Sequence, residues 1–274
     1  MSRAYHLGVS GGNQISVTRT RLIATLSLVA LLSVAGCAGL APESRDGEPT
    51  AEELRDRALE QMGDVETYSI EANTTVEVGE TTIRTQLDGV VNERTRRAEF
   101  ETTTRIGSSR GTDERAVEMY VDNRTVYVSP EGEDRWLTID VDDLAAYGGT
   151  NPWEADQVER QRILLEDADV EAVDNETVRG RSTTVVEAEP TNESLDEFVE
   201  ATFPQRAGFG GAEIRSAELT QWVTDDGYVL RTEAEMVVAV GGETSNITVR
   251  ADFDEFDEPT DIEIPNEATD GQRA

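Results

Sequence analysis

The sequence predicts an α+β fold in which a large antiparallel sheet is curved into an open half-barrel, with two or three helices on its concave side. From residue 68 onward, long segments alternate apolar and polar side chains, which is typical of strands with one buried and one solvated face. Helical spacing of apolar residues occurs at three places, one before these segments and two between them. Turn sequences such as Asp225-Asp226-Gly227 join neighbouring strands and favour a meander.

The first predicted helix runs from Ala51 to about Met62. Thr50 and Glu53 fit a capping box, and Leu54, Ala58 and Met62 share one face. A second helix is predicted over 152–166, where a proline stands near the start, and Ser194 is expected to cap a third over 195–203. Nine or ten strands are predicted over 68–78, 82–106 with a break near 92–93, 114–120, 125–128, 135–141, 178–189, 214–223, 228–240 and 244–253. We expect a folded domain over 50–265 and a disordered tail over 266–274.

Residues 22–37, LIATLSLVALLSVAGC, resemble an export signal that ends in a lipidation site. Arg19 and Arg21 form a basic flank, and the apolar run that follows has 14 residues, fewer than the roughly 20 of a spanning helix. Cys37, the sole cysteine, stands at the cleavage point, as in a lipobox. The alternative is a plain signal peptide with an incidental cysteine.

We therefore predict a signal peptide over residues 1–36, with either a long basic region or a start codon placed too early for residues 1–16. Residues 37–49 are then a lipidated Cys37 and a flexible tether. This arrangement would export the protein and anchor it to the outer face of the cytoplasmic membrane.

The charge balance is strongly acidic, with 57 Asp and Glu against 24 basic residues, all of which are arginine. Residues 1–37 hold three arginines and no acids, so the remainder is more acidic still. Acid excess together with a complete absence of lysine resembles haloarchaeal proteins. Such a charge repels itself in dilute buffer and is screened at molar salt. It excludes nucleic acid and anionic membrane surfaces as expected partners; a dedicated acidic patch for cations or basic proteins is the alternative.

Five Asn-x-Ser/Thr sequences are candidate N-glycosylation sites, provided that they are exposed on an exported chain. Their asparagines are Asn73, Asn123, Asn175, Asn192 and Asn246.

Three parts of the chain resemble a known family. They are the opening Leu54…Ala58…Met62…Val65…Tyr68-Ser69, the segment Gly227-Tyr228-Val229-Leu230-Arg231, and the final strand and exit from Asp252 to Pro265. Over about residues 50–265 the chain is similar to LolA-like lipoprotein carriers and to LppX/LprG-type lipid-binding lipoproteins. The resemblance implies an open half-barrel whose apolar concave face holds lipid or acyl chains under helices, with no catalytic residues.

Large apolar side chains are candidates either for a ligand cavity or for simple core. The candidates are Leu54, Met62, Trp136, Trp153, Phe198 and Trp222.

Catalytic chemistry is poorly represented. The single histidine, His6, falls in the predicted signal, so Ser-His-Asp, Cys-His and His/Cys zinc sites are not expected in the mature chain. Acidic clusters at 140–143 and 252–258 lack the spacing of an EF-hand. We therefore expect no enzyme, cofactor or metal. The predicted function is a membrane-anchored lipoprotein that binds or carries a hydrophobic, lipid-like ligand. The alternative is a surface protein-interaction or sensor module on the same fold.

Overall fold

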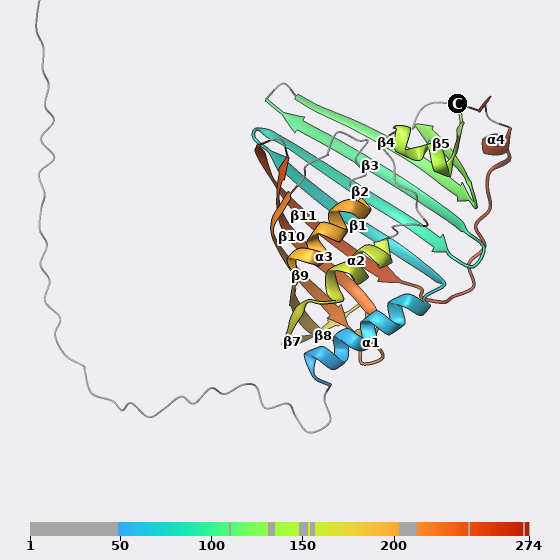
Figure 1. The fold of residues 1–274 in the computed structure, drawn as a ribbon. Helices are drawn as coiled ribbons and strands as arrows, with labels where there is room; N and C mark the ends of the chain where they lie inside the picture. The colour runs from blue at the N-terminus through green and yellow to red at the C-terminus, as the bar shows by residue number, and fades with distance from the viewer. Residues whose placement is uncertain are drawn as a thin grey trace, which may run out of the picture. The chain divides into compact units, whose positions relative to one another are not determined.

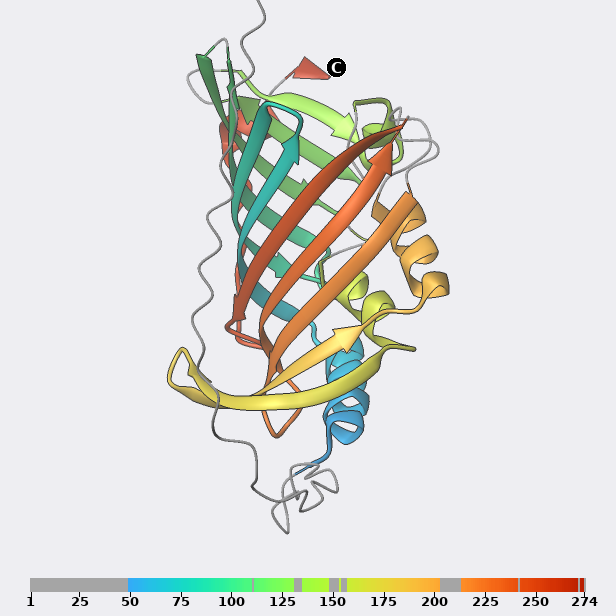
Figure 2. The same ribbon diagram turned by 90° about the vertical axis from the view of Figure 1, so that its left-hand side faces the viewer.

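One sheet organises the part of the chain that the structure, a computed structural model, describes: residues 49–109, 111–130, 135–147, 153, 157–202, 213–240, 242–270 and 272–273. These residues belong to one unit, Ser44–Ala274. The strand order is β12-β6-β5-β4-β3-β2-β1-β11-β10-β9-β8-β7, and every neighbouring pair is antiparallel except β12 with β6. The two edges do not pair with each other, so the half-barrel is open, and the predicted fold class is confirmed (Figures 1 and 2).

The strands are long and the helices few. The described elements are α1 (Ala51–Asp64), β1 (Thr67–Val78), β2 (Thr81–Asn92), β3 (Arg97–Ser108), β4 (Gly111–Asp122), β5 (Thr125–Pro130), β6 (Leu137–Asp140), a 3-10 helix (Val141–Tyr147), α2 (Gln157–Leu165), β7 (Asp169–Val178), β8 (Arg181–Glu189), α3 (Asn192–Thr202), β9 (Glu213–Val223), β10 (Val229–Val240), β11 (Glu243–Asp254), α4 (Asn266–Thr269) and β12 (Gln272–Arg273).

The concave face of the sheet is the face that carries Tyr68, Ile70 and Ala72 of β1, and it packs against α1, α2 and α3. In Figure 1 these three helices gather over the half of the sheet that contains β7–β11 and β1. The main hydrophobic core lies between them and the sheet, and includes Leu54 of α1, which is fully buried. The opposite, convex face carries a smaller apolar cluster of Val178, Val185, Trp222 and Leu230.

Local signals explain the helix starts. The predicted capping box is present at α1, where Thr50 Oγ1 accepts from the backbone N–H of Glu53 and the Glu53 side chain accepts from that of Thr50. The prediction that Ser194 caps α3 is wrong. The cap is Thr191, whose Oγ1 accepts from the backbone N–H of Ser194, so the helix begins at Asn192.

The C-terminal boundary also differs from the prediction. Asn266–Thr269, expected in a disordered tail, form α4, and Ala268 is completely buried. Gln272 and Arg273 then pair with the edge strand β6. The folded region therefore continues past residue 265. The buried side chain of Ala268 anchors α4, and the edge strand β6 offers backbone N–H and C=O groups with which Gln272 and Arg273 pair.

The convex face bears a row of five carboxylates on five neighbouring strands, named here the acidic row. Each residue stands directly opposite the next, in the order Asp252, Glu71, Asp88, Glu101 and Glu118. Arg231 contacts Asp252 at 2.7 Å, and Arg179 contacts Glu71 at 2.9 Å. Like charges placed opposite each other on paired strands are destabilising, so the row opposes pairing of β11, β1, β2, β3 and β4.

Tyr120 of β4 lies beside the end of the acidic row. Its hydroxyl is 2.9 Å from Glu118 Oε1 and 3.0 Å from Glu99 Oε1, and its ring packs on Trp136. Burial, followed by the hydrogen bonds to Glu118 and Glu99, raises the pKa of Tyr120.

Replacing Tyr120 with phenylalanine tests this contact. Because the folded-state pKa is raised above the unfolded value of about 10, the contribution of Tyr120 is intact below about pH 10 and is lost as pH rises toward the folded-state pKa. We expect Tyr120→Phe to cost about 1 kcal/mol at about pH 8 and less above pH 10. Denaturant unfolding of both proteins in molar salt at about pH 8 and about pH 11 measures this. A difference that stays constant across this range would contradict the contact.

Candidate functional site

Burial along β1 shows how far the helices cover the concave face. Tyr68 and Ile70 are 2% and 1% exposed, whereas Thr74, Val76 and Val78, which face the same way farther along the strand, are only half-buried. The pattern repeats on the neighbouring strands. Inward-facing and half-buried side chains there are Ile83, Thr85 and Leu87 on β2, Thr102, Thr104 and Ile106 on β3, and Ile247 and Val249 on β11. The concave face is therefore an apolar and threonine-lined strip that extends beyond the helix-covered core.

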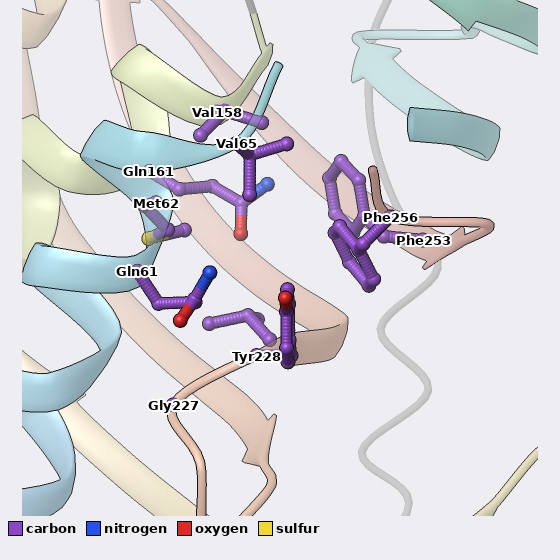
Figure 3. A pocket seen from close by; sticks show the side chains of 10 residues that line it. Gln61, Met62, Val65, Val158, Gln161, Gly227, Tyr228, Phe253 and Phe256 are labelled. Carbon is purple, nitrogen blue, oxygen red and sulfur yellow. The ribbon is translucent and has the colours of Figure 1, made fainter. Parts of the chain in front are cut away.

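Residues at the C-terminal end of α1 line two clefts. The first is a hollow lined by Met62 and Val65 of the α1 end, Val158 of α2, and Phe253 and Phe256 around the end of β11 (Figure 3). Among the described residues, none that lines it carries a charge, and its free volume of about 10 Å³ suits roughly one water molecule.

The second cleft is also lined by the end of α1 and has a volume of about 650 Å³. It shares Met62, Val65 and Val158 with the hollow, and Tyr68 and Trp153 add aromatic surface. Its lining also includes the charged Asp64, Glu66, Glu93 and Arg94, and Arg94 pairs with Glu66. The volume lies within the usual range for small-molecule sites, and the exposed lining is mostly polar with some apolar side chains among it.

The six predicted cavity residues fall into three groups. Met62 lines both clefts and Trp153 lines the larger one, where its Nε1 donates to the backbone carbonyl of Asn123 at 2.7 Å. Leu54 and Phe198 are packed inside the main core. Trp136 and Trp222 project from the convex face: Trp136 packs on Tyr120, and Trp222 Nε1 donates to Glu176 Oε2 at 2.9 Å. These last two are left out of the candidate site.

Sequence reasoning missed several lining residues. Val65 keeps the helical spacing from Met62 but stands just beyond α1, as its C-cap, and Val158 belongs to a helix with weak amphipathicity. Gln161 of α2 lines the hollow, and it contacts Thr232 and Gln221 behind it. For this polar contact the sequence did hold one signal. The alternation of β9 places Gln221, a polar residue, at an inward position between the apolar Leu219 and Val223.

The other predicted sites divide between described and undescribed residues. Cys37 and His6 lie outside the described residues. The five sequon asparagines are all exposed. Within the described ranges, no group of three or more acidic, cysteine or histidine side chains could hold a metal ion, and no helix is long and apolar enough to cross a membrane. The two acidic clusters instead pair with arginine, as Arg124 does with Asp142 and Arg250 with Asp252.

Comparisons with known proteins give similarity of fold. No protein-family model matches the chain, and no curated protein matches it in sequence. LprF from Mycobacterium bovis is 13% identical, with a TM-score of 0.49, over 81% of this chain and 100% of LprF. The lipoprotein LppX from Mycobacterium tuberculosis is 14% identical, with a TM-score of 0.44, over 77% and 96%. A LolA superfamily protein from Nitrosomonas europaea is 11% identical, with a TM-score of 0.24, over 80% and 96%. At these values the likeness is one of outline, and the functional argument rests on the residues of this chain.

Proposed function

We propose that this protein is a lipid-anchored, extracytoplasmic binding protein that holds the apolar part of a lipid-like ligand against the concave face of its half-barrel. The observation that carries the proposal is the half-buried apolar strip, which continues from the covered core along β1, β2, β3 and β11. Contiguous apolar surface of this kind is stabilised when an apolar partner removes it from water.

The cleft beside α1 supports the same function. Met62, Val65 and Val158 contribute apolar side chains to its lining, beside the charged Asp64, Glu93 and Arg94. An acyl or isoprenoid chain would bury apolar area at roughly 25 cal/mol per Å², and its polar end would remain at the wet rim.

Export and anchoring rest on the sequence pattern of residues 22–37, in which Cys37 takes the position that lipidation requires. A lipid on Cys37 and the tether that follows would hold the half-barrel near the membrane, where lipid ligands are available. We also propose glycosylation at one or more of the five sequons, because each asparagine is exposed. We also propose that the role is non-enzymatic; the chain after residue 37 has neither the histidine nor the cysteine that Ser-His-Asp and Cys-His catalysis require.

Solvent extraction of the purified protein tests the function directly. The full-length protein, purified in molar KCl, is extracted with organic solvent, and the extract is analysed by mass spectrometry. We expect a lipid or isoprenoid in near-stoichiometric amount. An empty extract, together with no binding of the uncharged apolar fluorophore phenylnaphthylamine, would overturn the proposal and favour a protein-interaction module.

A paired substitution on β1 locates the ligand surface. Val76 and Thr75 are adjacent and both half-buried, but only Val76 faces the concave side. We expect Val76→Glu to weaken phenylnaphthylamine binding by about tenfold or more, because a carboxylate in the apolar strip is costly to desolvate. Thr75→Glu makes the same charge change on the convex face, opposite Arg84, and should leave binding within about twofold. Equal losses in the two variants would place the ligand elsewhere.

A further inference from the structure

The apolar strip on the concave face ends at nearly the same level on three neighbouring strands. On β3 the inward side chains from Ile106 to Thr102 are half-buried, and the next inward residue, Phe100, is only 9% exposed. On β2 Leu87 is half-buried and Val91 is buried, and β1 changes in the same direction. Because the three strands are paired in register, this change forms a boundary across the sheet between the strip and the core.

A glycine stands at this boundary, and an aromatic ring fills the space beside it. Gly89 of β2 is the direct partner of Ile70 on β1 and of Phe100 on β3. A Cβ atom on Gly89 would lie 2.8 Å from Cε1 of Phe100 and closer still to Cδ1. The ring therefore occupies the space that any other side chain at position 89 would need. Gly89 does not have a left-handed φ, so it is the close approach of the ring that requires glycine here.

Phe100 belongs to the main core, but it borders the open part of the strip. Thr102 precedes it on the inward side of β3, and Leu87 stands directly opposite Thr102 on β2. Both are half-buried and can be reached from the strip. An apolar chain that lies against Leu87 and Thr102 meets the Phe100 ring at the next inward position. The ring thus stands where the chain would otherwise continue over the bare backbone of Gly89.

We propose that Phe100 is a specificity-determining residue: its ring over Gly89 is the end wall of the strip and sets the length of apolar chain that the site accepts. This inference rests on the proposed function and specifies its ligand by chain length. None of the inward residues of β1, β2 and β3 carries a charge, so this surface distinguishes ligands by shape and apolar area. A CH₂ group that fits on the strip leaves water, whereas one beyond the wall stays in water.

Displacement of phenylnaphthylamine from the full-length protein in molar KCl, by straight-chain alcohols of about 8 to 18 carbons, tests the wall. Each added CH₂ should strengthen binding to the wild-type protein about fourfold until the chain reaches the wall, and further carbons should add little. Phe100→Ala should move this limit to chains about three carbons longer. Alcohols beyond the wild-type limit should then bind about tenfold more tightly or better, and shorter ones should change by less than about twofold.

Phe100→Leu loses less packing and should move the limit in the same direction by fewer carbons, which keeps the test available if Phe100→Ala does not fold. Circular dichroism verifies the folding of each variant. Combining Phe100→Ala with Gly89→Val puts a side chain back over position 89. With the ring removed, the nearest remaining neighbour of its Cβ atom is the Glu99 carbonyl oxygen, at 3.0 Å. This double variant should return the limit toward the wild-type length.

Phe198→Leu is the matched control, because it makes the same change as Phe100→Leu at a similarly buried ring, 8% exposed, on α3. It should leave the limit in place. The wall would be overturned by a limit that does not move in the folded Phe100 variants, that moves equally in Phe198→Leu, or that Gly89→Val fails to restore. A wild-type affinity that rises through the whole series would also overturn it. Failure of the fluorophore and all the alcohols to bind would instead overturn the proposed function.

Discussion

In dilute buffer the folded domain is expected to lose its cooperative structure and to regain it at about 1 M KCl or NaCl. The chain has a net charge of −33, and five of its acidic side chains stand next to one another in the acidic row. In the acidic row, Glu101 stands directly between Asp88 and Glu118, with no oppositely charged residue opposite it on either strand. At about 0.01 M salt the Debye length is about 30 Å, so the whole row repels itself; at about 1 M it falls to about 3 Å, shorter than the spacing between paired strands.

Circular dichroism melts across a salt series measure this effect, and one pair of variants assigns its origin. Glu101→Gln removes the central charge of the acidic row and should lower the salt concentration needed for folding. Glu77→Gln removes the same charge from an exposed position on β1 whose cross-strand neighbours, Thr82 and Asn246, are neutral, so its effect should be smaller.

The two variants also separate screening from the general stabilisation that salts and osmolytes give by exclusion from protein surfaces. Exclusion would act on both variants alike, whereas screening acts most strongly where like charges face each other. A melt that is insensitive to salt, or an equal shift for the two variants, would contradict the role of the acidic row.

The sequence predicted the alternation of faces well, because each strand carries its own period. The inward set of β1, from Tyr68 to Val78, follows directly from that period. Alternation cannot show which strands become neighbours when they are far apart in the chain. The pairing of β1 with β11 joins Ile70 to Phe253, and this non-local pairing adds Asp252 to the four carboxylates that the consecutive strands β1–β4 bring together.

Two failures of prediction have local physical causes. Trp222 and Val223 are both apolar but point to opposite faces of β9, so the sequence does not show which of them is inward. Trp222 was predicted to line the cavity, although it lies on the convex face. The strand β7 was missed because most of its side chains are exposed and a bulge between Ala172 and Asp174 interrupts its alternation. Such a bulge suits an edge strand, since it discourages pairing with another chain.

Replacing Gly227 with alanine is expected to destabilise the domain by about 2–4 kcal/mol, through backbone strain and a clash with α1. Gly227 has φ +94° in the turn between β9 and β10. A Cβ atom there would lie 2.7 Å from the backbone carbonyl oxygen of Arg57. Backbone cannot move aside as a flexible side chain can. Arg57 also fastens α1 to this turn, since its Nη1 donates to the Asp225 carbonyl at 2.9 Å.

Gly242→Ala provides the matched control. Gly242 has φ +92°, but a Cβ atom there meets nothing within 4 Å. This variant should therefore show only the left-handed strain of about 1–2 kcal/mol. Denaturant unfolding of both variants in molar salt gives the two costs, and their difference is the contribution of the close approach between the turn and α1. Equal costs would mean that α1 yields freely to the added methyl group.

The same substitution connects the fold to the site. Gly227 lines the hollow beside α1, and Met62 of that helix belongs to both clefts. If the methyl group at 227 pushes α1 away from the sheet, the wall that carries Met62 and Val65 moves with it. At a salt concentration where Gly227→Ala is still folded, we therefore expect phenylnaphthylamine binding to weaken, while Gly242→Ala binds as the wild-type protein does. Unchanged binding in a folded Gly227→Ala protein would show that the ligand does not depend on the α1 wall, and the concave strip farther along the strands would then be the main contact surface.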